Sequence, residues 1–285
     1  MATRRGVPSH VPLVPLVTVL VVSGGYFLAP LLWLVLAATK DTGDLYATFG
    51  YWFGDRFALW SQLHDLFTAD SGIYLRWLAN SALYSIGGAA AATVFAGACG
   101  YAMAKFSFAG RELMFSTVLG GVLVPGTALA IPLYLLVSKA GLTDGYLSVL
   151  LPSMVSPFGV YLARIYATAS VPDELLDAAR VDGAGELRTF ATLGLRLMSP
   201  GLVTVFLFQF VAIWTNFLLP LVMLSDERRY PVTLGLYTWN SQVTHYPEYV
   251  GLVIVGSLVS VLPLAAAFLT LQRFWRTDLA AGSVK

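Results

Sequence analysis

The sequence predicts an all-α membrane protein with six transmembrane helices, and two observations support that prediction. Hydrophobic residues make up 57% of the 285 positions and charged residues only 12%, roughly half the charged share of soluble domains; the mean hydropathy is +0.73. In addition, six apolar runs reach the length of about 20 residues that crosses a bilayer. These runs span residues 12–39, 74–104, 113–138, 145–167, 199–224 and 249–272. We expect them to form a single transmembrane domain over residues 1–285.

The first run is predicted to be a permanent membrane anchor. Arg4 and Arg5 precede it, as basic residues precede the apolar core of a signal peptide, but that core spans only about 7–15 residues. The run at 12–39 is much longer, so we expect it to stay in the protein as the first transmembrane helix.

Proline, glycine and alanine shape the later runs. Each of Pro125, Pro132 and Pro220 removes a backbone hydrogen bond, which a bilayer tolerates only where protein or a water-filled cavity satisfies the freed carbonyl. Small residues cluster at 87–92 and 96–98, where they let another helix approach closely. This pattern indicates kinked, tightly packed helices around a path.

The distribution of Lys and Arg predicts that both termini are cytoplasmic. Eleven of the 17 basic residues fall on the same side as the termini and six on the other, and cytoplasmic segments carry the excess of Lys and Arg. The six on the outer side are Lys40, Arg56, Arg76, Lys139, Arg228 and Arg229. Segments 40–73 and 225–248 are then external, and residues 168–198 are cytoplasmic.

The external segment 40–73 is rich in aromatic residues, among them Trp52 and Trp60. Such rings either rest at the level of the lipid headgroups or form a docking surface for an external partner. Both interpretations stay open at this point.

Residues 168–198, called the hairpin below, are predicted to form two short helices outside the bilayer. Ser170 and Asp173 have the spacing of a capping box at the start of the first helix. Gly183 suits its C-terminal cap, because that position requires a positive φ. The second helix is expected at about 184–195. A charged hairpin between two membrane spans provides a docking site for a protein outside the bilayer.

Several kinds of chemistry are excluded by what the sequence lacks. It contains no phosphate-binding GxxxxGK[ST] motif, no GxSxG and no HExxH, so we expect no catalytic residues. One cysteine, Cys99, and three scattered histidines provide no metal site. The net charge of +1 gives no basic stripe for nucleic acid.

Ion-coupled transport is disfavoured as well. No Asp, Glu, Lys, Arg or His lies within 77–104, 113–138, 197–225 or 249–272, whereas proton- and sodium-coupled carriers use ionisable groups inside the membrane. The energy for transport would then come from a separate motor docked on the hairpin. The alternative is an ATP-independent channel or facilitator for small polar solutes.

Five residues within the runs are candidates for a translocation path, namely Asn80, Ser81, Gln209, Trp214 and Asn216. Uncharged amides beside an indole suit a polar, uncharged solute such as a sugar, through hydrogen bonds and ring stacking. The alternative for each residue is an ordinary hydrogen bond between helices, worth about 0.6 kcal/mol on average.

The motif at 174–184, ELLDAARVDGA, resembles the EAA loop of permease subunits in ABC importers, in the form found in carbohydrate importers of the maltose-permease type. Four further stretches resemble the same family in the same order, and with them the likeness covers nearly the whole chain. They are residues 76–81, 125–143, 214–221 and 272–285.

The resemblance implies the fold of a type I ABC importer permease in the bacterial cytoplasmic (inner) membrane. It implies ATP-driven, binding-protein-dependent import of a sugar or related polar solute. The implied partners are a second permease subunit, the same or different, two cytoplasmic ATPase subunits that hydrolyse ATP with Mg, and an extracytoplasmic solute-binding protein; no cofactor is expected on this chain. The ATPase-coupling residues would be Glu174, Asp177, Ala178, Ala179, Asp182, Gly183 and Ala184.

Three positions depart from the family pattern. Asp177 stands where the EAA loop usually has Glu, so that an ion pair with the ATPase would be longer or would use Glu174 instead. Arg196 replaces a usual Pro, so that the second helix would run on toward Pro200, and Asp278 replaces a usual Gly in the tail.

Overall fold

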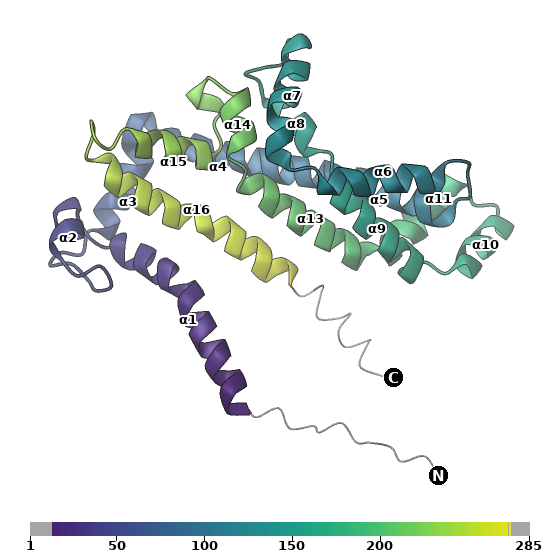
Figure 1. The fold of residues 1–285 in the computed structure, drawn as a ribbon, viewed down its shortest axis with the longest axis horizontal. Helices are drawn as coiled ribbons and strands as arrows, with labels where there is room; N and C mark the ends of the chain where they lie inside the picture. The colour runs from purple at the N-terminus through teal and green to yellow at the C-terminus, as the bar shows by residue number, and fades with distance from the viewer. Residues whose placement is uncertain (1–12, 273, 275–285) are drawn as a thin grey trace. The chain divides into compact units, whose positions relative to one another are not determined.

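The computed structural model describes residues 13–272 and residue 274. Regular secondary structure within these residues is entirely helical (Figure 1). The chain divides into two compact units, one formed by residues up to 66 with 242–259, the other by 67–241 with the residues from 260 onward. Arg4, Arg5, Asp278 and most of the family-like tail lie outside the described residues.

The first unit begins with the long apolar helix α1 (Leu13–Ala37). Its described side chains are mostly exposed, as expected of a helix that faces lipid. Two short helices follow, α2 (Thr42–Ala47) and α3 (Leu59–Thr68). The start of α16 (Tyr249–Leu271) belongs to this unit and its remainder to the other.

Lys40 organises the segment after α1. Its side chain is only 1% exposed, and its ammonium group donates to Thr48 Oγ1 at 2.9 Å and to the Phe49 carbonyl at 2.8 Å. Aromatic side chains of the same segment are exposed, which fits both interpretations of this surface. They are Tyr46, Phe49, Tyr51, Trp52, Phe53, Phe57 and Trp60.

The second unit is built along one helical stretch of 33 residues, Ile73–Lys105. It comprises α4 (Ile73–Ala82), the π-helical turn η2 (Leu83–Gly87) and α5 (Gly88–Lys105). At 1.5 Å per residue the stretch is about 50 Å long, whereas the hydrocarbon core of a bilayer is about 30 Å thick. The stretch is therefore long enough to cross the membrane and to extend beyond it.

The most extensively packed helix pair in this unit is α5 with α9 (Pro157–Ser170). A Cβ built on Gly100 would lie 2.6 Å from both the Ala163 Cβ and the Arg164 backbone nitrogen. The small residues of the second apolar run thus permit the close helix approach that the sequence predicts.

Three of the predicted runs are not single helices. Run 113–138 is divided into α6 (Arg111–Leu123) and α7 (Gly126–Lys139), which are bent by 105°. Run 145–167 is divided into α8 (Tyr146–Ser153) and α9, where the Ser156 side chain accepts the N–H of Gly159. Each break lies beside a proline, Pro125 or Pro157, whose ring prevents the preceding residue from continuing a helix.

The fifth run also ends early as a helix. Its helix α13 (Ser199–Trp214) is followed by the separate helix α14 (Leu218–Met223). Among the described residues four helical stretches are long and apolar enough to cross a membrane, with α8 and α9 counted together as Tyr146–Ser170, and the number rises to six if each of two bent pairs counts as one span.

The hairpin and residues 227–241 of the second predicted external segment lie at opposite ends of Ile73–Lys105. Helix α10 (Asp173–Val181) lies beyond the end of α5, while α15 (Val232–Ser241) lies beside α4 (Figure 1). Two short 3-10 turns, η1 (Ala69–Ser71) and η4 (Glu227–Arg229), accompany α4 at that end.

Candidate functional site

The hairpin starts differently from the sequence prediction. Ser170 is the last residue of α9, and α10 begins at Asp173 with Pro172 as its N-cap and no side-chain cap. The predicted capping box is therefore wrong. Ser170 is still helical, whereas an N-cap needs extended dihedrals, and Pro172 with φ −65° and ψ 138° supplies them.

The turn of the hairpin confirms the role of Gly183. Its φ is +75°, and the N–H of Ala184 donates to the Ala179 carbonyl at 2.9 Å, as in a glycine-capped helix end. The second helix starts at α11 (Glu186–Thr189), continues through η3 (Phe190–Gly194) and ends with α12 (Leu195–Leu197). It begins two residues later than predicted and passes Arg196.

One apolar side chain anchors the first hairpin helix, while others remain exposed. Leu176 is buried in a cluster with Tyr101, Ala163 and Met198. By contrast, Val181 is 88% exposed and Leu187 is 80% exposed. Both side chains lie within four residues of the Gly183 turn and are accessible to a protein that docks there.

Charged side chains link the two hairpin helices across the turn. The Arg180 guanidinium donates to Asp177 Oδ1 and to Glu186 Oε1, both at 2.9 Å. These carboxylates, Glu186 above all, raise the pKa of Arg180. Asp177 thus has a partner within the chain, whereas Glu174, Ala178 and Asp182 are exposed.

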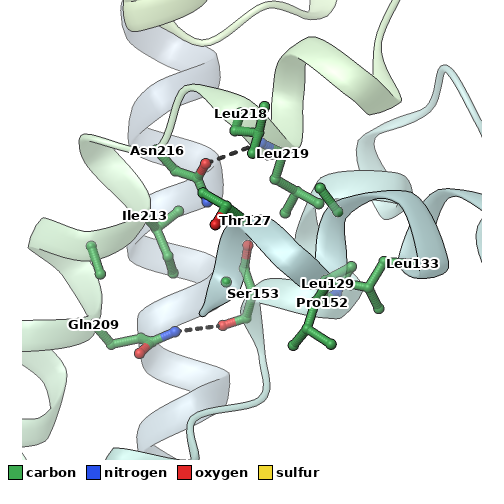
Figure 2. Close-up of a pocket in the computed structure, with 13 residues that line it drawn as sticks. Thr127, Leu129, Leu133, Pro152, Ser153, Gln209, Ile213, Asn216, Leu218 and Leu219 are labelled. Carbon is green, nitrogen blue, oxygen red and sulfur yellow. Dashed lines mark hydrogen bonds between the residues drawn. The ribbon is translucent and has the colours of Figure 1, made fainter. Parts of the chain in front are cut away.

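A cavity of about 400 Å³, called the amide pocket below, lies between α7, α8, α13 and α14. Figure 2 shows Thr127, Ser153, Gln209 and Asn216 around it, with leucines on one side. Gln209 Nε2 donates to the Ser153 carbonyl at 3.0 Å, and Asn216 Oδ1 accepts the N–H of Leu219 at 3.2 Å. The other amide atom of each residue has no hydrogen bond within the described chain, so it is available to a polar solute.

Trp214 faces a different cavity from the two amides. Residues 209, 213 and 216 share one face of the α13 end, whereas Phe206, Phe210 and Trp214 repeat every four residues and line an apolar groove of about 680 Å³. The Trp214 indole nitrogen donates to the Ser260 carbonyl at 3.2 Å. The predicted pairing of amides with an indole therefore does not form in one pocket.

Asn80 and Ser81 hold residues 225–231, called the outer loop below. Asn80 Nδ2 donates to the carbonyls of Arg228 at 2.9 Å and Tyr230 at 3.0 Å. Ser81 Oγ accepts the N–H of Val232 at 2.8 Å. Both polar side chains are buried and thereby satisfy backbone groups that would otherwise lack partners.

Asp144, a residue that the sequence did not single out, joins the outer loop to the turn between α7 and α8. It has a φ of +56°, and its Oδ1 accepts the N–H groups of Ser225 at 2.9 Å and Asp226 at 3.0 Å. These two bonds, with Arg229 beside them, lower the pKa of Asp144. No local sequence signal marks this contact, because its partners lie about 80 positions away.

Arg180, Thr127 and Ser153 were also missed. The spacing of Asp177 and Arg180, three positions apart on a helix, predicts their ion pair. The Thr127 hydroxyl and the Ser153 carbonyl could not be placed in the amide pocket from the sequence, because their positions depend on the helix breaks beside Pro125 and Pro157. Within the described residues no group of three or more His, Cys, Asp or Glu could hold a metal ion.

Comparisons with known proteins agree with this geometry. Residues 96–275 match the family of binding-protein-dependent transport system inner membrane components. The chain is 32% identical to the arabinooligosaccharides transport system permease protein AraQ of Halalkalibacterium halodurans, over 95% of this chain and 98% of AraQ. It is 30% identical to the lactose transport system permease protein LacG of Rhizobium radiobacter, over 90% of each chain.

A solved structure supports the fold. A chain of a bacterial ABC transporter involved in the import of the acidic polysaccharide alginate has a TM-score of 0.78 to this structure. The match covers 91% of this chain and 95% of that one at 18% sequence identity.

Proposed function

The chain belongs to the family of binding-protein-dependent transport system inner membrane components, and on that premise we propose that it translocates a sugar or related polar solute into the cytoplasm. As a member of this family it is the membrane permease component of an ABC importer and has no ATPase site of its own. The alternative of an ATP-independent channel or facilitator is therefore not retained. Relatives are named for the transport of arabinooligosaccharides and lactose, and the uncharged amide pocket suits a solute rich in hydroxyl groups.

The hairpin is the observation that best supports coupling to a separate motor. Leu176 fixes it to the ends of α5 and α9, while Val181, Leu187 and neighbouring carboxylates such as Asp182 are exposed around the Gly183 turn. We propose that a cytoplasmic ATPase subunit, which binds ATP and Mg, covers this surface. The importer would then contain two permease subunits, two ATPase subunits and an external solute-binding protein.

The charge distribution supports an orientation with both termini in the cytoplasm. The six-span topology predicted from the sequence assigns eleven basic residues to the side of the hairpin and six to the side of the outer loop. The hairpin then faces the ATPase, and the outer loop faces the solute-binding protein.

Reconstitution tests this function directly. Proteoliposomes that contain the permease pair with its ATPase subunits are expected to take up labelled oligosaccharide only when ATP and the solute-binding protein are both supplied. The purified chain alone is expected to give no flux. Solute flux through the lone chain that ignores ATP would contradict the proposal.

Replacing Asn216 with serine tests the amide pocket. In the wild type, Asn216 Oδ1 accepts the N–H of Leu219. A serine hydroxyl can still accept this N–H, but the amide N–H donor of Asn216 is lost. A lost hydrogen bond of about 0.5–1.5 kcal/mol is expected to raise the half-saturating solute concentration about 2- to 10-fold, as measured by initial rates of uptake.

Asn240→Ser is the matched control, because Asn240 is exposed on α15 and does not line the pocket. It is expected to behave as the wild type. Gln209→Leu removes the second amide of the pocket. If Asn216→Ser, Gln209→Leu and the wild type have equal half-saturating solute concentrations, the amide pocket is not part of the translocation path.

A further inference from the structure

A second polar cavity lies at the end of α4 that the charge distribution places outside the cell. It has a volume of about 550 Å³ and is called the arginine pocket below. Its lining is Asp70, Ser71, Gly72, Ile73, Arg76 and Arg228. No function assigned so far to the hairpin, the amide pocket or the outer loop uses these side chains.

Two guanidinium groups dominate the charge of this pocket. Arg76 comes from the first turns of α4 and Arg228 from η4, and both residues are exposed. Asp70 is the single acidic residue of the lining, and neither arginine forms an ion pair within the described residues. The pocket lining therefore carries a net positive charge, and neither guanidinium group is paired with a carboxylate of the described chain.

The other outer basic residues differ from this pair. Lys40 is buried and donates to Thr48 and Phe49, and Arg229 pairs with Asp144 at 3.2 Å. Arg56 and Lys139 are exposed and line neither of the two polar cavities. Basic residues are disfavoured on the outer side of a membrane protein, so two that converge on one cavity from distant segments require a reason.

The arginine pocket is held open by contacts that leave both guanidinium groups free. The Trp77 indole nitrogen donates to the Glu227 carbonyl at 2.8 Å, and Asn80 donates to the Arg228 carbonyl at 2.9 Å. These bonds fix the backbone of η4 against α4 without engaging the Arg228 side chain. A site whose frame is already fixed loses less entropy when it binds a partner.

We propose that the arginine pocket receives a carboxylate side chain of the external solute-binding protein. The inference rests on the proposed function, which supplies this partner and places the pocket outside. Arginine presents a planar fork of N–H donors that matches a carboxylate in bidentate geometry, and two such forks can hold one acidic residue or two neighbouring ones. Opposite charges also speed and orient the docking of the two proteins.

The contact lies close to elements that line the amide pocket. Arg228 belongs to the outer loop, whose Ser225 and Asp226 donate to Asp144. Asp144 lies in the turn between α7 and α8, and both helices line the amide pocket. Docking at Arg228 therefore acts on a loop that is hydrogen-bonded to the turn between two helices of the proposed path.

Charge reversal in the reconstituted importer tests the proposal. Arg76→Glu, Arg228→Glu and the double variant are compared with the wild type, using a purified solute-binding protein that stimulates ATP hydrolysis by the wild-type complex. Each single variant is expected to raise the half-maximal concentration of binding protein about tenfold, and the double variant more. Basal ATP hydrolysis is expected to stay unchanged, and salt is expected to weaken docking in the wild type but not in the double variant.

Lys139→Glu is the matched control, because it reverses an exposed basic residue of the same unit outside the pocket. It is expected to leave the half-maximal concentration within about twofold of the wild type. Arg228→Lys, which keeps the charge but loses the bidentate fork, is expected to fall between the wild type and Arg228→Glu. Unchanged stimulation in the double variant would overturn the inference while leaving the proposed function intact. An effect that appears only in vesicles containing anionic phosphatidylglycerol, and not in pure phosphatidylcholine, would assign the pocket to lipid headgroups and overturn it as well. If no binding protein stimulates ATP hydrolysis by the wild-type complex, that result contradicts the proposed function itself.

Discussion

Replacing Gly183 with valine is expected to reduce ATP-driven uptake about 5- to 30-fold while the protein still folds. Gly183 has a φ of +75°, and a β-branched residue in that conformation is strained by about 1–3 kcal/mol. A Cβ at this position would meet no atom within 4 Å, so the effect is purely conformational. If restoring the turn for ATPase docking costs about 1–2 kcal/mol, the competent hairpin becomes 5- to 30-fold less populated. Uptake into proteoliposomes and co-purification of the ATPase measure the loss.

Gly185→Val provides the control two residues away. Gly185 also has no atom within 4 Å of a built Cβ, but its φ is −70° and its ψ is 154°, which valine adopts readily. This variant is expected to transport at the wild-type rate. Equal uptake by both variants would show that the turn conformation is not needed for coupling.

Replacing Gly100 with alanine is expected to destabilise the whole transmembrane bundle. The new Cβ would lie 2.6 Å from the backbone nitrogen of Arg164, and backbone in a packed helix cannot move aside as a side chain can. Overpacking of this kind typically costs about 1–3 kcal/mol, and here α5 and α9 must separate. We expect a lower midpoint of thermal unfolding and a lower yield of folded protein in detergent.

Gly97→Ala makes the same change one turn earlier in α5. Its Cβ would lie 3.0 Å from a terminal methyl group of Leu202, which can rotate away, so this variant is expected to unfold within a few degrees of the wild type. If Gly100→Ala were as stable as Gly97→Ala, the close approach of α5 and α9 would not limit stability.

Hydropathy predicted the helices themselves, because apolar runs of sufficient length identify membrane helices without tertiary information. They could not predict where those helices change direction. Hydropathy stays high through Val124 and Pro125 although α6 and α7 are bent by 105°, since both sides of the break are equally apolar. The prolines indicated kinks but not their angles, which packing determines.

Some features of the candidate site could be predicted from the sequence and others could not. Gly183 was placed correctly because a positive φ at a helix end restricts the choice of residue. The separation of Trp214 from Gln209 and Asn216 follows from helical periodicity and could have been predicted. The partners of Asn80 could not, because they are backbone carbonyls nearly 150 positions away.

The way the outer loop is fastened has an evolutionary consequence. Trp77, Asn80 and Tyr84 all donate to main-chain carbonyls of residues 227–230, and every amino acid offers the same carbonyl. Side chains at Glu227 and Arg228 can therefore be exchanged without loosening the loop. The residues displayed by the outer loop can in this way change at a few positions, while two donors on α4 and one in η2 keep the loop backbone in place.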